Sequence, residues 1–314
     1  MKKQNKIIYI AGYGRSGSTL LERLLQIQPE IHAGGELVNY FDYFSSRHNL
    51  CTCGQLFSSC SFWSTIARRL EQEGFPVQGY PDYSRLRRKC EAVMSHGGAL
   101  FRGGYHQEYT RLTTAFIKAV FNQLNASRNI LTDSSKTAYA EYRRPENIYQ
   151  LKEFKIKAVH LVRDPRGVVW SMQKGLNRAL EAGRSRKALL PWMRAVMGWI
   201  RANKAADRLR PILGNNDCTL LRYESLAANP VLELQRLQAV LEIDLGRSIS
   251  IAAKAMQGQI IRMPAAHQLA GNRMRFSQDL TIKLDSAWEK GLRPARIKLI
   301  KALAGPMMRK YGYL

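Results

Sequence analysis

A glycine-rich loop between an apolar run and an amphipathic segment is the feature that most constrains how this chain can fold. The run "IIYIA" (7–11) is short and rich in β-branched residues, which predicts a buried strand. "GYGRSG" (12–17) follows it, and "TLLERLLQI" (19–27) then places apolar residues at helical spacing. A strand, turn and helix of this kind directs backbone N–H groups and the positive end of a helix dipole at one point, which makes an anion site. Glycines that serve only a tight turn are the alternative interpretation.

The loop fits the phosphate-binding template G-x-x-x-x-G-K-[ST] at every position except the lysine. Gly12 and Gly17 bracket four residues, and Thr19 supplies a hydroxyl, but Ser18 stands where the template has lysine. A cation is present inside the loop instead, as Arg15. The pattern therefore predicts a bound anion that differs from an ordinary nucleoside triphosphate.

Strands and helices alternate along the rest of the chain. We expect strands at 129–133, 156–162 and 217–223, and helices at 167–178 and 229–243. Such alternation predicts an α/β fold in which helices flank a central parallel sheet on both faces. The ligand site of such a sheet lies beyond the carboxyl ends of its strands.

We expect one domain over residues 1–314. Residues 60–127, which include an amphipathic stretch at 109–124, are predicted to form a helical insertion. The part from 283 to 314 is predicted to be mostly helical, and within it 293–310 is basic and amphipathic. We expect the apolar side of that segment to pack on the domain; peripheral contact with a membrane surface is the alternative.

The net charge of +25 creates a positive field that concentrates anionic partners. The basic residues are spread along the whole chain, so most of them are interpreted as a solvated surface. No apolar stretch approaches the length of a membrane-spanning helix, and the chain start runs directly into the first predicted strand. We therefore predict a cytoplasmic protein.

Three of the five cysteines cluster in "CTCGQLFSSC", as Cys51, Cys53 and Cys60. An odd number of cysteines argues against a disulfide framework. With His48 nearby, the three would form a zinc knuckle, but C-x-C-x6-C is not a common zinc spacing. We interpret them as reduced structural thiols and predict no metal requirement.

Taken together, the motifs resemble those of the sulfotransferases that use 3′-phosphoadenosine 5′-phosphosulfate (PAPS), especially the bacterial carbohydrate-type and tyrosylprotein-type branches. The resemblance extends over roughly residues 6 to 45 and 129 to 276, and it rests on "GYGRSGSTLL", "HAGGELVNYF", "TDSSK", "RDPRGVVWS", "LLRYESL" and "GNRMRF". It implies a P-loop-like three-layer fold and transfer of a sulfuryl group from PAPS to an acceptor hydroxyl, without a metal ion.

In this family the first loop holds the 5′-phosphosulfate. The resemblance gives that role to Gly14, Arg15, Ser16, Gly17, Ser18 and Thr19. Arg15 then replaces the lysine of the cytosolic family members, which points away from small phenols and steroids as acceptors.

The resemblance also implies a site for the 3′-phosphate of PAPS. An arginine at a strand end and a serine in the following helix bind this group in the family, and they correspond to Arg163 and Ser171. A guanidinium offers a bidentate fork for phosphate. A salt bridge from Arg163 to Asp164 or another surface carboxylate is the alternative. "GNRMRF" is similar to a late loop that closes over this phosphate, with Arg273 or Arg275 as donor.

Three further residues are implied to act near the reacting groups. Glu36 resembles the glutamate that removes the acceptor proton, with His32 as second choice; a carboxylate at a helix N-terminus is the alternative for Glu36. Lys136 looks like the lysine that reaches the leaving group, with a solvated loop lysine as the alternative. Tyr223 resembles a tyrosine packed near the adenine, although a buried core tyrosine bonded through its hydroxyl shows the same pattern.

The acceptor stays open among a glycan, a lipid-linked sugar, a peptide tyrosine and a metabolite hydroxyl. We expect the insertion at 60–127 to select it, and the positive surface favours an acidic acceptor. Two other classes are weighed against this interpretation. A P-loop kinase of a small metabolite needs magnesium and usually the missing lysine. A noncatalytic nucleic-acid-binding protein would show clustered aromatic and basic motifs, which are not evident, so no nucleic acid is expected as partner.

Overall fold

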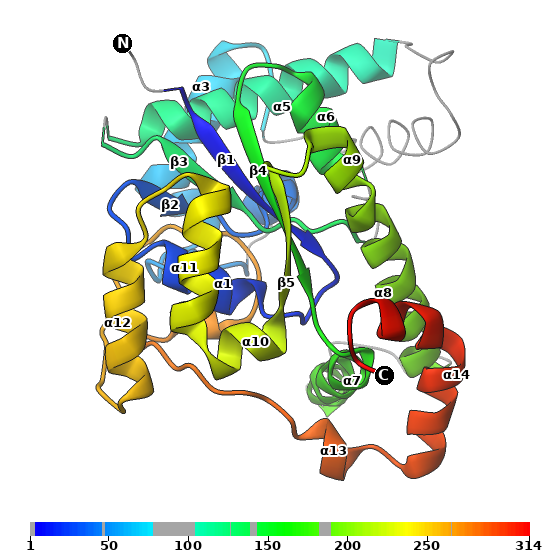
Figure 1. The fold of residues 1–314 in the computed structure, drawn as a ribbon. Helices are drawn as coiled ribbons and strands as arrows, with labels where there is room; N and C mark the ends of the chain where they lie inside the picture. Colours follow the sequence, from blue (N-terminus) through cyan, green and yellow to red (C-terminus); the bar gives the residue numbers. More distant parts are fainter. Residues whose placement is uncertain are drawn as a thin grey trace.

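A parallel sheet of five strands forms the centre of the molecule (Figure 1). The structure, a computed structural model, describes residues 4–45, 48–77, 104–125, 127–138, 143–181, 190–264 and 266–314. The strand order is β2-β3-β1-β4-β5. The strands are β1 (Lys6–Gly12), β2 (Ile31–Ala33), β3 (Ile130–Asp133), β4 (Lys155–Val162) and β5 (Cys218–Arg222). The predicted α/β class with a central parallel sheet is confirmed.

The sheet is buried on both faces, and its central strand is accordingly apolar along nearly its whole length. Ile7, Ile8, Tyr9 and Ile10 of β1 are each at most 1% exposed. Strand β1 pairs in parallel with β3 on one side and with β4 on the other. Near-continuous apolar runs are typical of such strands, which is why four of the five were predictable. Strand β2, with three residues, is too short to show a period in the sequence.

Helices cover both faces of the sheet (Figure 1). The face that carries Ile8 and Ile10 packs in one core with α1, α10, α11 and α12. The face that carries Ile7 and Tyr9 packs in a second core with α3, α5 and the end of α8. The described helices are α1 (Ser18–Leu25), α2 (Tyr40–Phe44), α3 (Ser61–Gln72), α5 (Gly104–Gln123), α6 (Arg144–Gln150), α7 (Pro165–Glu181), α8 (Pro191–Asp207), α9 (Leu209–Leu213), α10 (Tyr223–Ala228), α11 (Pro230–Leu241), α12 (Gly246–Met256), α13 (Trp288–Gly291) and α14 (Pro294–Lys310).

The basic segment near the end of the chain forms α14. Its residues Ile300, Ala304 and Met308 are buried in one core with residues of α7 and α8. This is the packing predicted for its apolar side. Among the described helices, none combines the length and the apolar composition that crossing a bilayer requires.

The predicted insertion at 60–127 contributes α3 and α5, which pack against each other. Residues 78–103 and 126 of that segment lie outside the described residues. The predicted helix at 109–124 corresponds to most of α5.

A buried ion pair closes the carboxyl end of β3. The Asp133 side chain and the Arg144 side chain are each 1% exposed. Asp133 Oδ2 accepts hydrogen bonds from Arg144 Nε at 3.1 Å and from Nη2 at 3.0 Å. Asp133 Oδ1 also accepts one from the backbone N–H of Ser135 at 2.9 Å. The pair therefore fixes the turn that follows β3.

Removing the arginine from this pair should be strongly destabilising. Arg144→Met leaves the Asp133 carboxylate buried without its charge partner, and we expect a loss of about 3–5 kcal/mol of unfolding free energy in urea denaturation. The control is Lys118→Met, which removes an ion pair with Glu153 whose side chains are 47% and 45% exposed. That change should cost at most about 1 kcal/mol. Equal losses in the two variants would contradict the interpretation.

Candidate active site

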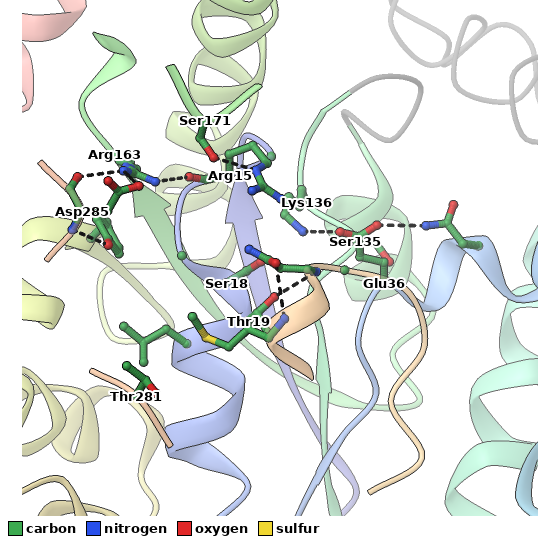
Figure 2. A pocket seen from close by; sticks show the side chains of 18 of the residues that line it. Arg15, Ser18, Thr19, Glu36, Ser135, Lys136, Arg163, Ser171, Thr281 and Asp285 are labelled. Carbon is green, nitrogen blue, oxygen red and sulfur yellow. Dashed lines mark hydrogen bonds and ion pairs between the residues drawn. The ribbon is translucent and has the colours of Figure 1, made fainter. Parts of the chain in front are cut away.

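A cavity of about 550 Å³ lies beyond the carboxyl ends of the strands (Figure 2). Its wall takes residues from the segments that follow all five strands, as a parallel sheet predicts. Later residues between 271 and 285 complete it. The lining residues are Gly14, Arg15, Gly17, Ser18, Thr19, Leu20, Glu36, Val38, Asn39, Tyr43, Ser135, Lys136, Arg163, Ser171, Tyr223, Gly271, Asn272, Met274, Thr281, Lys283 and Asp285.

The loop between β1 and α1 requires glycine at both of its ends. Gly12 and Gly17 have φ values of +116° and +94°, which favour glycine. A Cβ atom on Gly17 would lie 2.5 Å from the ring of Tyr223, and one on Gly12 would lie 2.3 Å from the carbonyl oxygen of Leu161. Gly17 precedes α1, whose first turn has no side-chain cap. The backbone N–H groups of this first turn have no side-chain acceptor, and its residues Ser18, Thr19 and Leu20 line the cavity. Such a helix end suits an anion.

Arg15, the cation of the loop, contacts two other residues that were predicted to bind the cofactor. Arg15 Nε donates a hydrogen bond to Ser171 Oγ on α7 at 2.9 Å. Arg163, at the end of β4, donates from Nη1 to the backbone oxygen of Arg15 at 3.1 Å. The structure thus brings Arg15, Arg163 and Ser171 into one network on one side of the cavity (Figure 2).

Arg163 is paired with a carboxylate from a distant segment. Its Nη2 donates to Asp285 Oδ2 at 3.0 Å and to the backbone oxygen of the same residue at 2.9 Å. The guanidinium also lies over the Tyr223 ring, 4.4 Å from the ring centre. Partial burial opposes ionisation of Asp285, but hydrogen bonds from Arg163 and Ala287 hold its pKa below the ordinary value. The alternative interpretation of Arg163, a salt bridge to a carboxylate, is therefore present, but with Asp285, whose side chain is 43% exposed, and not with Asp164, which binds Arg166.

Glu36 and Lys136 form an ion pair on the other side of the cavity. Lys136 Nζ lies 2.8 Å from Glu36 Oε1, and it also donates to the backbone oxygen of Ser134 at 2.8 Å. The Lys136 side chain is 7% exposed, so it is not a solvated loop lysine. Glu36 makes no capping bond to the turn that it precedes, and its second oxygen accepts from Asn39 Nδ2 at 3.0 Å. Its carboxylate therefore faces the lysine and the cavity instead of stabilising a helix end.

A buried glutamate holds these elements together. Glu22 on α1 is 2% exposed. Its oxygens accept from Gly35 N at 3.0 Å, Thr132 Oγ1 at 2.6 Å, Ser134 Oγ at 2.9 Å and Gln268 Nε2 at 3.1 Å. Burial raises the pKa of this carboxyl, while the hydrogen bonds and the Lys136 charge oppose the rise. Sequence reasoning missed Glu22, because it lies on the polar side of the predicted helix, nearly opposite Leu20 and Leu24, where an exposed glutamate is expected.

His32, the second choice for the base, lies outside the cavity wall. It is 2% exposed on β2, and its ring stacks on Phe62 with 4.9 Å between ring centres. Burial, with smaller effects of the Arg128 and His267 charges, lowers its pKa to about 3. A histidine with this pKa and this position is poorly suited to accept a proton from a substrate in the cavity.

Tyr223 lines the cavity with its hydroxyl already engaged. The hydroxyl donates to the backbone oxygen of Lys283 at 3.2 Å and accepts from the backbone N–H of Asp285 at 3.0 Å. The residue therefore anchors the segment that contains Lys283 and Asp285 to the end of β5.

Two predicted cofactor residues do not line the cavity. Ser16 is 2% exposed and is not among the wall residues, while Arg273 is exposed on the 3-10 turn η3 (Arg273–Phe276). The Asn272 side chain caps that turn by accepting from the Met274 N–H. Asn272 and Met274, on either side of Arg273, line the cavity. Lys283 supplies the late cation of the wall instead of Arg273.

The segment 281–285 contributes three wall residues that sequence reasoning missed. Thr281, Lys283 and Asp285 alternate with Ile282 and Leu284. That period of two was the available signal, because it puts the three polar side chains on one face of an extended segment.

The family of the chain follows from comparison with known proteins. A family profile described as "Sulfotransferase family" matches residues 8–246. The match covers most of the chain, and this chain belongs to the sulfotransferase family. The predicted enzyme class is thereby confirmed, and the kinase and nucleic-acid-binding interpretations are set aside. No match was found among curated proteins.

Solved structures of sulfotransferases share the fold. The sulfotransferase domain of the Synechococcus PCC 7002 olefin synthase is 18% identical, with a TM-score of 0.50 over 97% of this chain and 96% of that chain. The sulfotransferase domain from the curacin biosynthetic pathway is 16% identical, with a TM-score of 0.50 over 97% of this chain and 99% of that chain. Mouse sulfotransferase SULT7A1, complexed with PAP, is 11% identical, with a TM-score of 0.51 over 98% of this chain and 86% of that chain.

The burial of His32 predicts a loss of stability in acid. Its pKa of about 3 in the folded state lies below the ordinary 6.5, so its stabilising contribution is complete above pH 6.5 and is lost as the pH falls toward 3. Between about pH 6 and pH 4 we expect the wild type to lose up to about 1.4 kcal/mol of unfolding free energy per pH unit more than His32→Gln, which does not titrate. Urea denaturation at each pH measures this. Parallel pH profiles of the two proteins would contradict the prediction.

Proposed function

We propose that this sulfotransferase uses PAPS as its donor and transfers the sulfuryl group in line to an acceptor hydroxyl. The observation that carries the proposal is that one cavity joins the anion-binding loop to the Glu36–Lys136 ion pair. The PAP bound to the structurally similar mouse enzyme supports the choice of donor. PAP is the nucleotide product that PAPS leaves behind.

The donor would occupy the side of the cavity formed by the loop and the strand ends. The uncapped first turn of α1 and the hydroxyls of Ser18 and Thr19 suit the 5′-phosphosulfate. Arg163 and Ser171 suit the 3′-phosphate, and a phosphate there shares the Arg163 guanidinium with Asp285. Tyr223 lies beside both positions, where an adenine ring has an aromatic neighbour.

Glu36 would act as the general base. As the acceptor oxygen forms its bond to sulfur, the hydroxyl proton passes to a Glu36 carboxylate oxygen. The bond between sulfur and the bridging oxygen breaks, and its electron pair leaves with the 5′-phosphate of PAP. Base assistance of this kind contributes about 10²- to 10⁴-fold to a rate.

Arg15 and Lys136 would stabilise the charge that develops on the leaving phosphate. Lys136 is held within reach of the reacting groups by Glu36 and by the backbone of Ser134. Each preorganised donor of this kind is worth about 3 kcal/mol, by analogy with oxyanion holes. Two cations at this place provide the charge neutralisation that magnesium provides in kinases, so the step needs no metal ion.

The acceptor would enter beside Glu36. Val38, Asn39 and Tyr43 line the cavity there, and the α2 segment packs in one core with α3 and α5 of the insertion. We infer that this side selects the acceptor. The net charge of +25 favours an acidic one.

Binding of the nucleotide product tests the donor. In calorimetric titrations without added magnesium, adenosine 3′,5′-bisphosphate should bind more tightly than 5′-AMP or ATP. Arg163→Ala should weaken binding of the bisphosphate by roughly 10- to 100-fold, the value of a lost charged hydrogen bond. The affinity for 5′-AMP should change little. Equal losses for both nucleotides would remove Arg163 from the 3′-phosphate site. A preference for ATP that appears with magnesium would overturn the proposed donor.

Loss of the base should reduce turnover and leave nucleotide binding intact. Glu36→Gln is expected to lower the rate of sulfuryl transfer from labelled PAPS by about 10²- to 10⁴-fold. Its affinity for adenosine 3′,5′-bisphosphate should stay close to that of the wild type. The control is Asp42→Asn, which changes an exposed carboxylate outside the cavity wall. If Glu36→Gln turns over as fast as this control, Glu36 is not the base.

A further inference from the structure

Three cysteines and one histidine meet in a cluster outside the active site. Cys51, Cys53 and Cys60 lie between α2 and α3, and His267 follows Cys60 by 207 residues, in the segment after α12. One ligand atom from each of the four lies within 4.8 Å of all the others. His48, which the sequence interpretation placed beside these cysteines, is exposed and is not part of the cluster.

We propose that this cluster binds a structural zinc ion through three thiolates and one imidazole. Zn–S bonds of about 2.3 Å and Zn–N bonds of about 2.0 Å in a tetrahedron put neighbouring ligand atoms roughly 3.5–3.8 Å apart. Cys53 Sγ lies 3.6 Å from Cys60 Sγ. His267 Nδ1 lies 3.6 Å from Cys51 Sγ and 3.2 Å from Cys60 Sγ. These separations are close to the edges of a tetrahedron, whereas a disulfide needs about 2.0 Å.

The backbone around the cysteines directs their sulfurs to one point. The Gly54 N–H donates to the Cys51 carbonyl at 2.9 Å, and the φ of +87° at Gly54 closes a tight turn that brings Cys51 and Cys53 together. Cys60 directly precedes α3, a helix of 12 residues. Its sulfur therefore lies at the positive end of a helix, where a thiolate is favoured.

The histidine is held in place from both sides. Its ring stacks on Phe62, with 4.9 Å between ring centres and 1° between the planes. Thr52 Oγ1 accepts from the Gln268 N–H at 2.8 Å and donates to the Ala266 carbonyl at 2.5 Å, so the residues on either side of His267 are bonded to the cysteine turn. An imidazole so oriented is a preformed ligand, and thiolates with imidazole are a donor set that suits zinc.

A zinc ion here would be structural, because four protein ligands leave no open position for a substrate. Its effect would be on the cavity wall. Leu269, two residues after His267, donates to the Gly34 carbonyl at 3.0 Å and accepts from the Glu36 N–H at 2.8 Å. Gly271 and the wall residues after it follow directly. The metal would therefore anchor the segment that supports Glu36 and closes the cavity.

The zinc content of the purified protein tests the proposal. Protein prepared without oxygen or chelator from zinc-supplemented cells should contain about one zinc ion per chain by elemental analysis. Cys53→Ser should contain at least about tenfold less, since a ligand is lost. Cys53 is exposed, so this change does not disturb the core. His267→Ala should show the same loss, and His48→Ala, the matched control, should keep its zinc.

A wild-type protein without stoichiometric zinc would overturn the proposal, and so would a Cys53→Ser variant that keeps its zinc or a His48→Ala variant that loses it. Hydrogen exchange tests the structural role separately. Removal of zinc from the wild type should speed exchange of the Leu269 amide, which is bonded to Gly34. Unchanged exchange after complete removal would overturn that role. Neither measurement depends on the proposed donor or base.

Discussion

The active site depends on one buried carboxylate that does not itself touch the cavity. Glu22 lies on α1, the helix that follows the glycine-rich loop. Its four hydrogen bonds reach the loop before Glu36, strand β3, the turn that carries Lys136 and the segment that closes the cavity wall. A buried carboxylate is costly unless such donors satisfy it. The position of the helix that follows the glycine-rich loop and the geometry of the Glu36–Lys136 ion pair are consequently coupled through one side chain.

Two cations of the cavity are partly neutralised by carboxylates of the protein itself. Arg163 holds Asp285, and Lys136 holds Glu36. A bound anion would therefore share each cation with a carboxylate instead of meeting an isolated charge. This lowers the cost of keeping two cations in a half-buried site, and it favours ligands with enough negative charge to compete.

The sequence predicted the sheet well where burial leaves a continuous apolar run, as in β1 and β4, and missed β2, whose pairing with β3 depends on tertiary contacts. Most wall residues follow a predicted strand or belong to a motif, so their meeting point was predictable. Asp285 and Lys283 follow no strand, and only the folded chain places them beside Arg163 and Tyr223. His267 was equally unpredictable, because no spacing rule links it to cysteines 207 to 216 residues earlier.

Arg15 and Lys136 share an unusual backbone conformation. Their φ values are +67° and +69°, in the left-handed region where a non-glycine residue costs roughly 1–2 kcal/mol. Glycine or asparagine would be the cheaper residue at both positions. The fold thus carries a conformational cost at the two places where the proposed chemistry requires a cation. Glycine or asparagine at these positions would relieve backbone strain but remove the charge, so selection for stability and selection for catalysis favour different residues there.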